Sequence, residues 1–121
     1  MKAILMTAVG FAEVLKLQEL AEPEITSSTH VKIKVQAAGV NPVDTKVRRH
    51  GLLFNEALPA ILGCDGAGEV VEIGADVSQF KVGDKVWFCH GGLGREPGSY
   101  AEYSVIAVSY THLTLPTICS V

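Results

Sequence analysis

The sequence predicts a mainly β fold, a small barrel or sandwich that carries one short helix. Apolar and polar residues alternate with a period of two in several short segments, and turn residues separate these segments at short intervals. The chain has 121 residues, which favours one domain. Its 12 glycines and 5 prolines also fit a fold with many turns.

The expected strands follow this alternation in chain order. Residues 14–17 are a weak candidate, and a loop is expected near Pro23 and residues 26–29. The strand at residues 31–36 has the clearest pattern, because three apolar side chains alternate there with Lys, Lys and Gln. Turns at residues 74–76 and 81–85 separate the remaining candidates, which are residues 69–73, 86–88 and 100–105.

One short helix is expected at residues 41–49. Asn41 is a good N-cap, Pro42 suits the first helical position, and Asp44 lies three residues after the cap. Arg48 and Arg49 favour the negative end of the helix dipole, and Gly51 marks the end of the helix. The segment therefore contains both start and stop signals for about two turns of helix.

Composition excludes several classes of protein. The net charge of −3 leaves no basic surface for nucleic acid. No apolar run reaches the roughly 18 residues that span a membrane, and residues 1–6 are too short an apolar stretch for a signal peptide. Three cysteines without CxxC spacing do not indicate a disulfide framework. We therefore expect a cytoplasmic protein with no nucleic-acid or membrane partner.

The last 14 residues, 108–121, differ in character from the rest. A DNA string that encodes residues 108–117 resembles the transposon-end adapter of sequencing libraries, which would continue into a final Val and a stop codon. We therefore expect residues 1–107 to form the domain and residues 108–121 to be a non-native tail. The alternative is a natural, divergent tail, and the genomic sequence after Ala107 would distinguish the two.

Several spaced motifs resemble one family. They are Gly-Cys-Asp-Gly-Ala-Gly-Glu-Val-Val-Glu-Ile-Gly at residues 63–74, Phe-Lys-Val-Gly-Asp-Lys-Val at 80–86, Gly-Val-Asn-Pro-Val-Asp at 39–44 and Gly-Ser-Tyr-Ala-Glu-Tyr at 98–103. In this order they resemble the medium-chain dehydrogenase/reductase superfamily, from residue 1 to about Ala107. The resemblance implies a GroES-like β-barrel that, in full members, continues into a Rossmann domain binding NAD(P)H. The sequence shows no Rossmann domain, and Gly-Gly-Leu-Gly at 91–94 is expected to be a plain loop because no βαβ unit follows.

The resemblance also bears on zinc. Asn41 stands at the position of a zinc-ligating Cys in zinc alcohol dehydrogenases, Cys64 at that of a ligating His, and Val43 at that of the hydroxyl residue that relays a proton. A catalytic zinc needs three protein ligands, and Cys89 next to His90 is not a usual ligand spacing. We therefore expect no metal, with both cysteines packing as small apolar side chains.

The run Asn-Pro-Val-Asp at residues 41–44 is typical of the zinc-free quinone oxidoreductase branch. The resemblance implies hydride transfer from NADPH or NADH to the β-carbon of a quinone or enone. Asn41 and Asp44 are the candidate catalytic residues, and Asn41 with Pro42 the candidate cofactor-binding residues. The alternatives are structural: Asn41 as a helix cap and Asp44 as a first-turn carboxylate.

Three further residues are candidates for a substrate pocket, namely Cys64, Asp65 and His90. His90 follows a strand and is a candidate proton donor, although a loop histidine without a role is the alternative. Competing functions are a fragment of a zinc-type alcohol dehydrogenase and a stand-alone GroES-like binding module. We expect the chain to be inactive alone, and a full-length parent to be a homodimeric enzyme acting on a small carbonyl or quinone compound.

Overall fold

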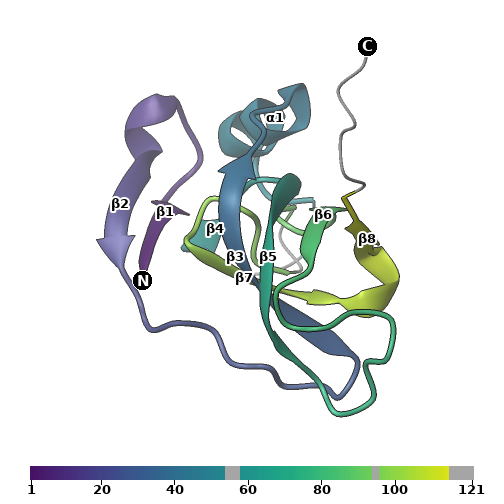
Figure 1. Ribbon diagram of the computed structural model, residues 1–121. Coiled ribbons are helices and arrows are strands. Elements are labelled where there is room, and N and C mark those ends of the chain that lie inside the picture. Colours follow the sequence, from purple (N-terminus) through teal and green to yellow (C-terminus); the bar gives the residue numbers. More distant parts are fainter. Residues whose placement is uncertain (54–57, 94–95, 115–121) are drawn as a thin grey trace.

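The computed structural model describes residues 1–53, 58–93 and 96–114. Within them the fold is mainly β with one α-helix, as the sequence predicts (Figure 1). The helix is α1 (Pro42–His50), and 3₁₀ turns lie at Ala12–Val14 and Val108–Tyr110. The strands are β1 (Lys2–Met6), β2 (Leu15–Glu19), β3 (His30–Ala38), β4 (Ala60–Ile61), β5 (Asp65–Ile73), β6 (Lys85–Cys89), β7 (Tyr103–Ala107) and β8 (Thr111–Leu113).

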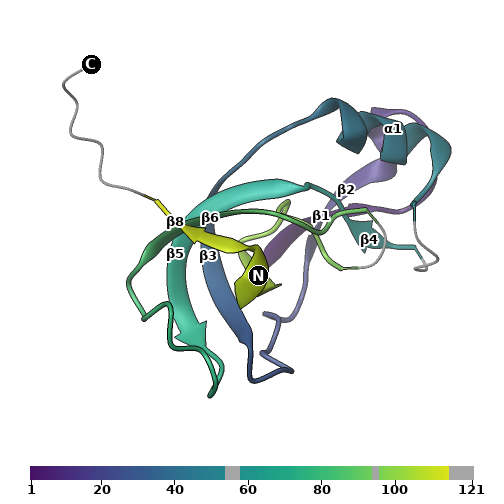
Figure 2. The same ribbon diagram turned by 90° about the vertical axis from the view of Figure 1, so that its right-hand side faces the viewer.

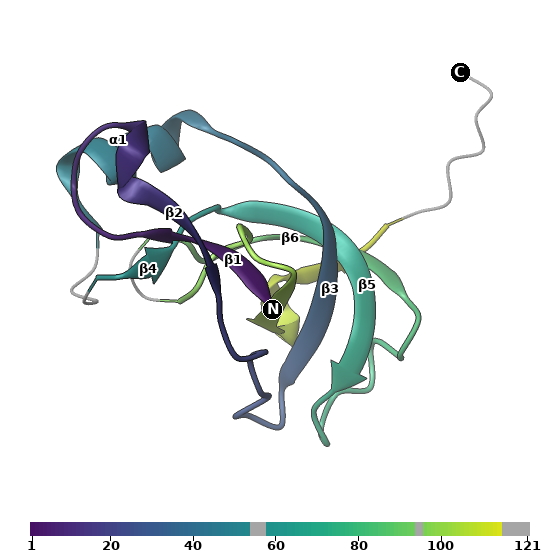
Figure 3. The same cartoon turned by 90° about the vertical axis from the view of Figure 1, so that its left-hand side faces the viewer.

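The strands form two antiparallel sheets. Three strands pair in the order β2-β1-β4, and five pair in the order β7-β3-β5-β6-β8, which curls into half a barrel. The loop from β2 to β3 and the loop from β5 to β6 lie together at the end opposite α1 (Figures 1, 2 and 3). Backbone bonds join these loops, since Gly74 N–H donates to the His30 carbonyl and Asp76 N–H to that of Ser28.

Two apolar clusters fill the fold. The larger cluster lies inside the curled sheet and is built from alternating side chains of β3, β5, β6 and β7, among them Val31, Ile33, Val70, Phe88 and Ile106. The smaller cluster contains Met6, Val47 and Leu62, and it packs α1 against β1 and the segment before β5. The second cluster fixes the position of α1, and therefore of the residues at its start.

Most expected strands are confirmed, with shifted ends. The pattern at residues 31–36 lies within β3, and residues 69–73 and 86–88 lie within β5 and β6. Residues 14–17 were placed one residue too early, because Ala12–Val14 forms a 3₁₀ turn closed by a bond from Val14 N–H to the Phe11 carbonyl. Strands β1, β4 and β8 were not predicted.

The last strand begins three residues later in the structure than in the prediction. Residues 100–105 were expected to be one strand, but β7 begins at Tyr103. Before Tyr103 the chain makes backbone contacts with β1 of the other sheet. The Ile4 N–H donates to the Tyr100 carbonyl, and Ala3 forms an isolated bridge with Ala101. This crossing from one sheet to the other brings Tyr100 next to the start of α1.

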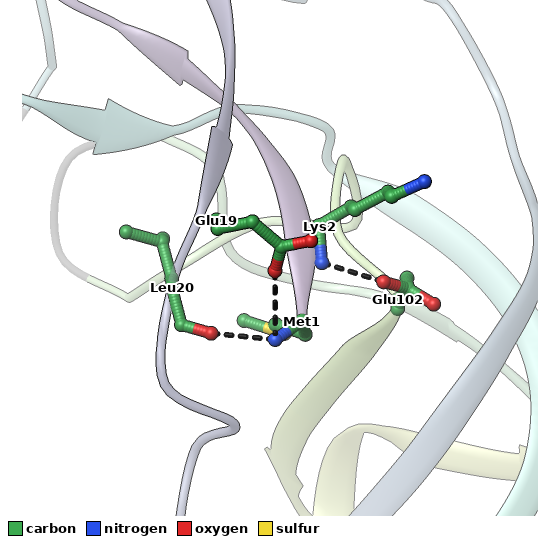
Figure 4. Close-up of polar contacts among 5 residues, drawn as sticks. All are labelled: Met1, Lys2, Glu19, Leu20 and Glu102. Carbon is green, nitrogen blue, oxygen red and sulfur yellow. Dashed lines mark hydrogen bonds and ion pairs between the residues drawn. The ribbon is translucent and has the colours of Figure 1, made fainter.

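The N-terminal residues contact both the end of β2 and the segment that leads into β7. The Met1 α-amine donates to the Leu20 carbonyl at 2.5 Å and lies 3.5 Å from the Glu19 carboxylate (Figure 4). The Lys2 N–H donates to Oε1 of Glu102 at 2.5 Å. These contacts fasten β1 between β2 and the segment that leads into β7.

After the 3₁₀ turn at Val108–Tyr110, strand β8 extends the large sheet. Strand β8 pairs with β6, and the His112 ring stacks on Trp87 with ring centroids 4.3 Å apart. The origin of residues 108–121 stays a prediction, and residues 115–121 lie outside the described part of the chain. Among the described residues, no helix has the length and apolar character needed to cross a membrane.

Candidate active site

Two hydrogen bonds between Asn41 and Asp44 hold the start of α1. Oδ2 of Asp44 accepts the Asn41 N–H at 2.8 Å, and the Asp44 N–H donates to the Asn41 carbonyl at 3.0 Å. Pro42 occupies the first turn, and Gly51 ends the helix with a φ of 110°. The predicted start and end of the helix are therefore confirmed.

The side chain of Asn41 points away from the helix toward Cys64. Its Nδ2 lies 3.7 Å from the Cys64 Sγ, within reach of a weak hydrogen bond to sulfur. Cys64 directly precedes β5, so this contact joins the start of α1 to the start of a core strand. The structure thus brings together two residues that the sequence analysis assigned to the site.

Asp44 lies beneath this contact. The residue is only 3% exposed, and its Oδ1 is buried without a hydrogen-bond partner. Its other oxygen accepts bonds from Asn41 and from the hydroxyl of Tyr100, which lies 3.2 Å away. Asp44 is therefore placed to position Asn41 and is shielded from any ligand in the neighbouring cavity.

Tyr100 belongs to the site, although the sequence analysis gave it no role. Its hydroxyl lies 3.3 Å from the Gly39 carbonyl, in addition to the contact with Asp44. Burial, followed by the charge of Asp44, raises the pKa of Tyr100 above its ordinary value. The phenol is therefore protonated at neutral pH and acts as a hydrogen-bond donor.

A cavity of about 260 Å³ is lined in part by Cys64, the residue that the Asn41 amide contacts; Asn41 itself is not a lining residue. The apolar wall of the cavity includes Val43 of α1 and Leu93 of the loop after β6. Its remaining lining residues are Cys64, Cys89, His90, Gly91 and Glu96. The cavity thus combines an apolar wall with a few polar atoms, the usual makeup of a small-molecule site.

His90 lies in the cavity wall, where two contacts hold its ring. Its Nε2 pairs with the carboxylate of Glu96, and the ring stacks on Tyr110 with centroids 3.9 Å apart. No group that orients this histidine could be identified from its sequence neighbours. Glu96 is six residues away, and only the fold shows that it pairs with His90. The Glu96 contact lies within residues 1–107 and positions the imidazole at the cavity, whereas Tyr110 belongs to the segment that is expected to be non-native.

Asp65 does not lie in the same cavity. Its Oδ1 accepts the Gly39 N–H at 3.0 Å, and it lines a separate, open hollow between β3, β5 and β6. A Cβ at Gly39 would lie 2.4 Å from this oxygen, so a larger residue there would have to displace the Asp65 carboxylate. The expected group of Cys64, Asp65 and His90 is therefore divided between two places.

The electrostatic environment keeps the Cys64 thiol protonated. Burial raises the pKa of Cys64, and nearby Asp44, Cys89 and Asp65 raise it further. The hydrogen bond from Asn41 acts in the opposite direction, because a donor stabilises the thiolate. On balance these effects favour the neutral thiol of Cys64 when no metal is bound.

The donor set around Asn41 does not fit a catalytic zinc site. An amide stands beside the single thiol of Cys64, whereas such sites use three ligands drawn from thiolate, imidazole and carboxylate. In the described residues, no three His, Cys, Asp or Glu side chains form a group that could hold a metal.

The Gly-Gly-Leu-Gly segment at 91–94 was predicted to be a plain loop. Its described residues, 91–93, lie outside any helix or strand, and the Gly92 N–H donates to the Glu96 carbonyl. Gly94 and Arg95 lie outside the described residues.

Comparisons with known proteins place these features in a family context. The model of the alcohol dehydrogenase GroES-like domain matches residues 27–117. A quinone oxidoreductase of Mus musculus is 42% identical over 107 residues, which are 88% of this chain and 31% of the mouse protein. The chain thus spans about a third of the length of the curated relatives that it matches.

Solved structures show the same relation. The quinone oxidoreductase from Coxiella burnetii superimposes with a TM-score of 0.86 at 36% identity, over 97% of this chain and 38% of that one. An Escherichia coli quinone oxidoreductase complexed with NADPH gives a TM-score of 0.84 at 29% identity, over 99% of this chain and 35% of that one.

Proposed function

The chain belongs to the alcohol dehydrogenase GroES-like domain family, and we propose that it forms the acceptor-binding part of a longer NAD(P)H-dependent oxidoreductase. The acceptor is a quinone, an enone or a similar carbonyl compound, reduced by hydride transfer. The observation that carries this proposal is the Asn41 amide beside Cys64 at an apolar cavity, where a zinc enzyme would place metal ligands. The names of the quinone oxidoreductase relatives support the same assignment.

The chemistry of the cavity suits a flat, weakly polar acceptor. Val43 and Leu93 line the cavity and provide apolar contact for a ring. The Asn41 amide lies against Cys64 of the cavity wall, from where we propose that it donates to a carbonyl oxygen. Sulfur is a weak acceptor, so a ligand carbonyl that displaces Cys64 Sγ gives Asn41 a stronger hydrogen bond. A donor at this oxygen stabilises the negative charge that develops there as the β-carbon is reduced.

NADPH or NADH supplies the hydride when bound. We assign Asn41 and the exposed Pro42 beside it to the side of the site that faces the nicotinamide. Asp44 holds Asn41, Cys64 forms part of the acceptor wall, and His90 is placed to give a proton to the reduced acceptor. Positioning of the two reactants provides most of the rate enhancement in such a reaction.

We expect the longer protein to contain no stoichiometric zinc, because Asn41 cannot replace a thiolate ligand and the described residues contain no group of three His, Cys, Asp or Glu side chains that could hold the ion. Elemental analysis of the purified, longer protein is the measurement. One zinc per chain would instead support the zinc-type alcohol dehydrogenase. The proposed homodimer can be checked on the same sample by light scattering.

A cavity-filling substitution tests the assignment of the acceptor site. Val43→Phe in the longer protein places a ring in the 260 Å³ cavity and is expected to raise the KM for a quinone about tenfold, equivalent to about 1.4 kcal/mol. The matched control is Val82→Phe, at an exposed position in the turn before β6, which is expected to leave the KM unchanged. Equal KM values for Val43→Phe and the parent would place the acceptor elsewhere.

A further inference from the structure

We propose that Tyr100 is a positioning residue, whose hydroxyl holds Asn41 at the cavity through the carboxylate of Asp44. The inference rests on the proposed function only in assigning the Asn41 amide to the acceptor. The contacts themselves form a continuous path. The Tyr100 hydroxyl and the Asn41 N–H both donate to Oδ2 of Asp44, at 3.2 and 2.8 Å, and the Asn41 amide reaches Cys64.

The Tyr100 ring has a fixed place that does not depend on its hydroxyl. Its backbone N–H donates to the Leu62 carbonyl at 3.0 Å, and the preceding Ser99 is bonded through its N–H to Gly63 and through Oγ to Asp65. The ring lies against Gly63, where a Cβ would be 2.7 Å from the ring carbon Cδ1. Removing the hydroxyl alone should therefore leave the ring in place.

The hydroxyl acts on a segment that few other contacts hold. Gly39 and Asn41 connect β3 to α1, and the Tyr100 hydroxyl lies within 3.3 Å of both the Gly39 carbonyl and Asp44. Oδ1 of Asp44 is buried without a partner, so the orientation of this carboxylate depends on the two donors at Oδ2. Loss of the phenolic donor leaves Asp44 with the Asn41 N–H as its one donor at Oδ2, so the carboxylate is held less firmly.

Cys64 provides a readout that needs no enzymatic activity. The Asn41 amide lowers the pKa of its thiol, whereas Asp44 of α1 and Asp65 of β5 raise it. Cys89 of β6 also faces Cys64, and His90 and Glu96 lie in the wall of the same cavity. A displaced Asn41 therefore reduces the thiolate fraction of Cys64 at a given pH.

The test follows alkylation of Cys64 by iodoacetamide against pH in the full chain carrying Cys89→Ser and Cys119→Ser. The ratio of the rate at pH 8 to the limiting rate at high pH measures the thiolate fraction, and the limiting rate separately measures access. Tyr100→Phe is expected to lower this ratio about threefold or more. The matched control is Tyr103→Phe, which removes a phenolic hydroxyl from β7, where the ring lies near Lys32.

Asn41→Ala in the same background is expected to give the same decrease, and the double variant Asn41→Ala/Tyr100→Phe no further decrease, because Tyr100 acts through Asn41. Circular dichroism confirms that each variant is folded. An unchanged ratio in folded Tyr100→Phe, or effects of the two substitutions that simply add, would overturn the proposal. Since no nicotinamide or quinone is present, failure of the proposed function would not alter this result.

Discussion

Replacing Asp44 with alanine is expected to lower the free energy of unfolding by about 2–4 kcal/mol and to remove most of the activity of the longer oxidoreductase. The substitution leaves the buried Asn41 N–H and the Tyr100 hydroxyl without their charged acceptor. Part of this loss is offset, because the unpartnered Oδ1 of Asp44 no longer has to be buried. Urea unfolding and the kcat for quinone reduction are the two measurements.

Asp76→Ala is the matched control for this prediction. Its carboxylate accepts a bond from Ser28 Oγ at 2.7 Å in an exposed loop, so its removal is expected to cost less than about 1 kcal/mol. Equal losses of stability for the two variants would mean that the hydrogen bonds of Asp44 contribute no more to stability than the exposed bond between Asp76 and Ser28. Full activity in Asp44→Ala would contradict its positioning role.

Replacing Gly68 with alanine is expected to destabilise the chain by about 3 kcal/mol or more, and to leave a large fraction unfolded. Gly68 lies in the middle of β5, and a Cβ there would be 2.0 Å from the backbone oxygen of Lys34 in β3. A backbone atom cannot move aside as a flexible side chain can, so β3 and β5 would have to separate. The measurement is the urea midpoint of the 121-residue chain.

Gly10→Ala provides the matched control for this second substitution. At that position the nearest atom is Cγ1 of Val14, a side-chain methyl 3.0 Å away, and a small movement relieves the contact. The expected change is within about 1 kcal/mol. A similarly small change for Gly68→Ala would show that the close approach of β3 and β5 is not required.

The sequence predicted the parts of the fold whose patterns are local. The alternation in β3 and the start and stop signals of α1 are properties of neighbouring residues, and both are confirmed. Gly66 and Gly68 lie within β5, where the close approach of Phe88 and of β3 leaves no room for a Cβ. Such a requirement depends on a partner strand far away in the sequence.

The same limit applies to the candidate site. Asn41 and Asp44 share one helix start and could be found from a single motif. Tyr100 is 56 residues away from Asp44, and the crossing between the two sheets brings it into contact. The one available signal was Gly-Ser-Tyr-Ala-Glu-Tyr at residues 98–103, which marked a family feature but gave no indication of the partner of its first tyrosine.

His90 and Asp65 show how adjacency in sequence can mislead. Asp65 is next to Cys64, yet alternation along β5 directs its carboxylate to Gly39 on another side. His90 is distant from Cys64 in sequence, but antiparallel pairing of β5 with β6 brings both to one cavity. Strand pairing, which the sequence did not specify, decides which of these residues meet.

The most direct test of the proposed function follows oxidation of NADPH by 1,4-benzoquinone. Two proteins are compared: residues 1–107 continued into their natural gene sequence, and the 121-residue chain. We predict turnover by the longer protein, at least about tenfold slower turnover in its Asn41→Ala variant, and none above background by the chain alone. Absence of turnover by the longer protein, or turnover by the chain alone that Asn41→Ala abolishes, would contradict the account.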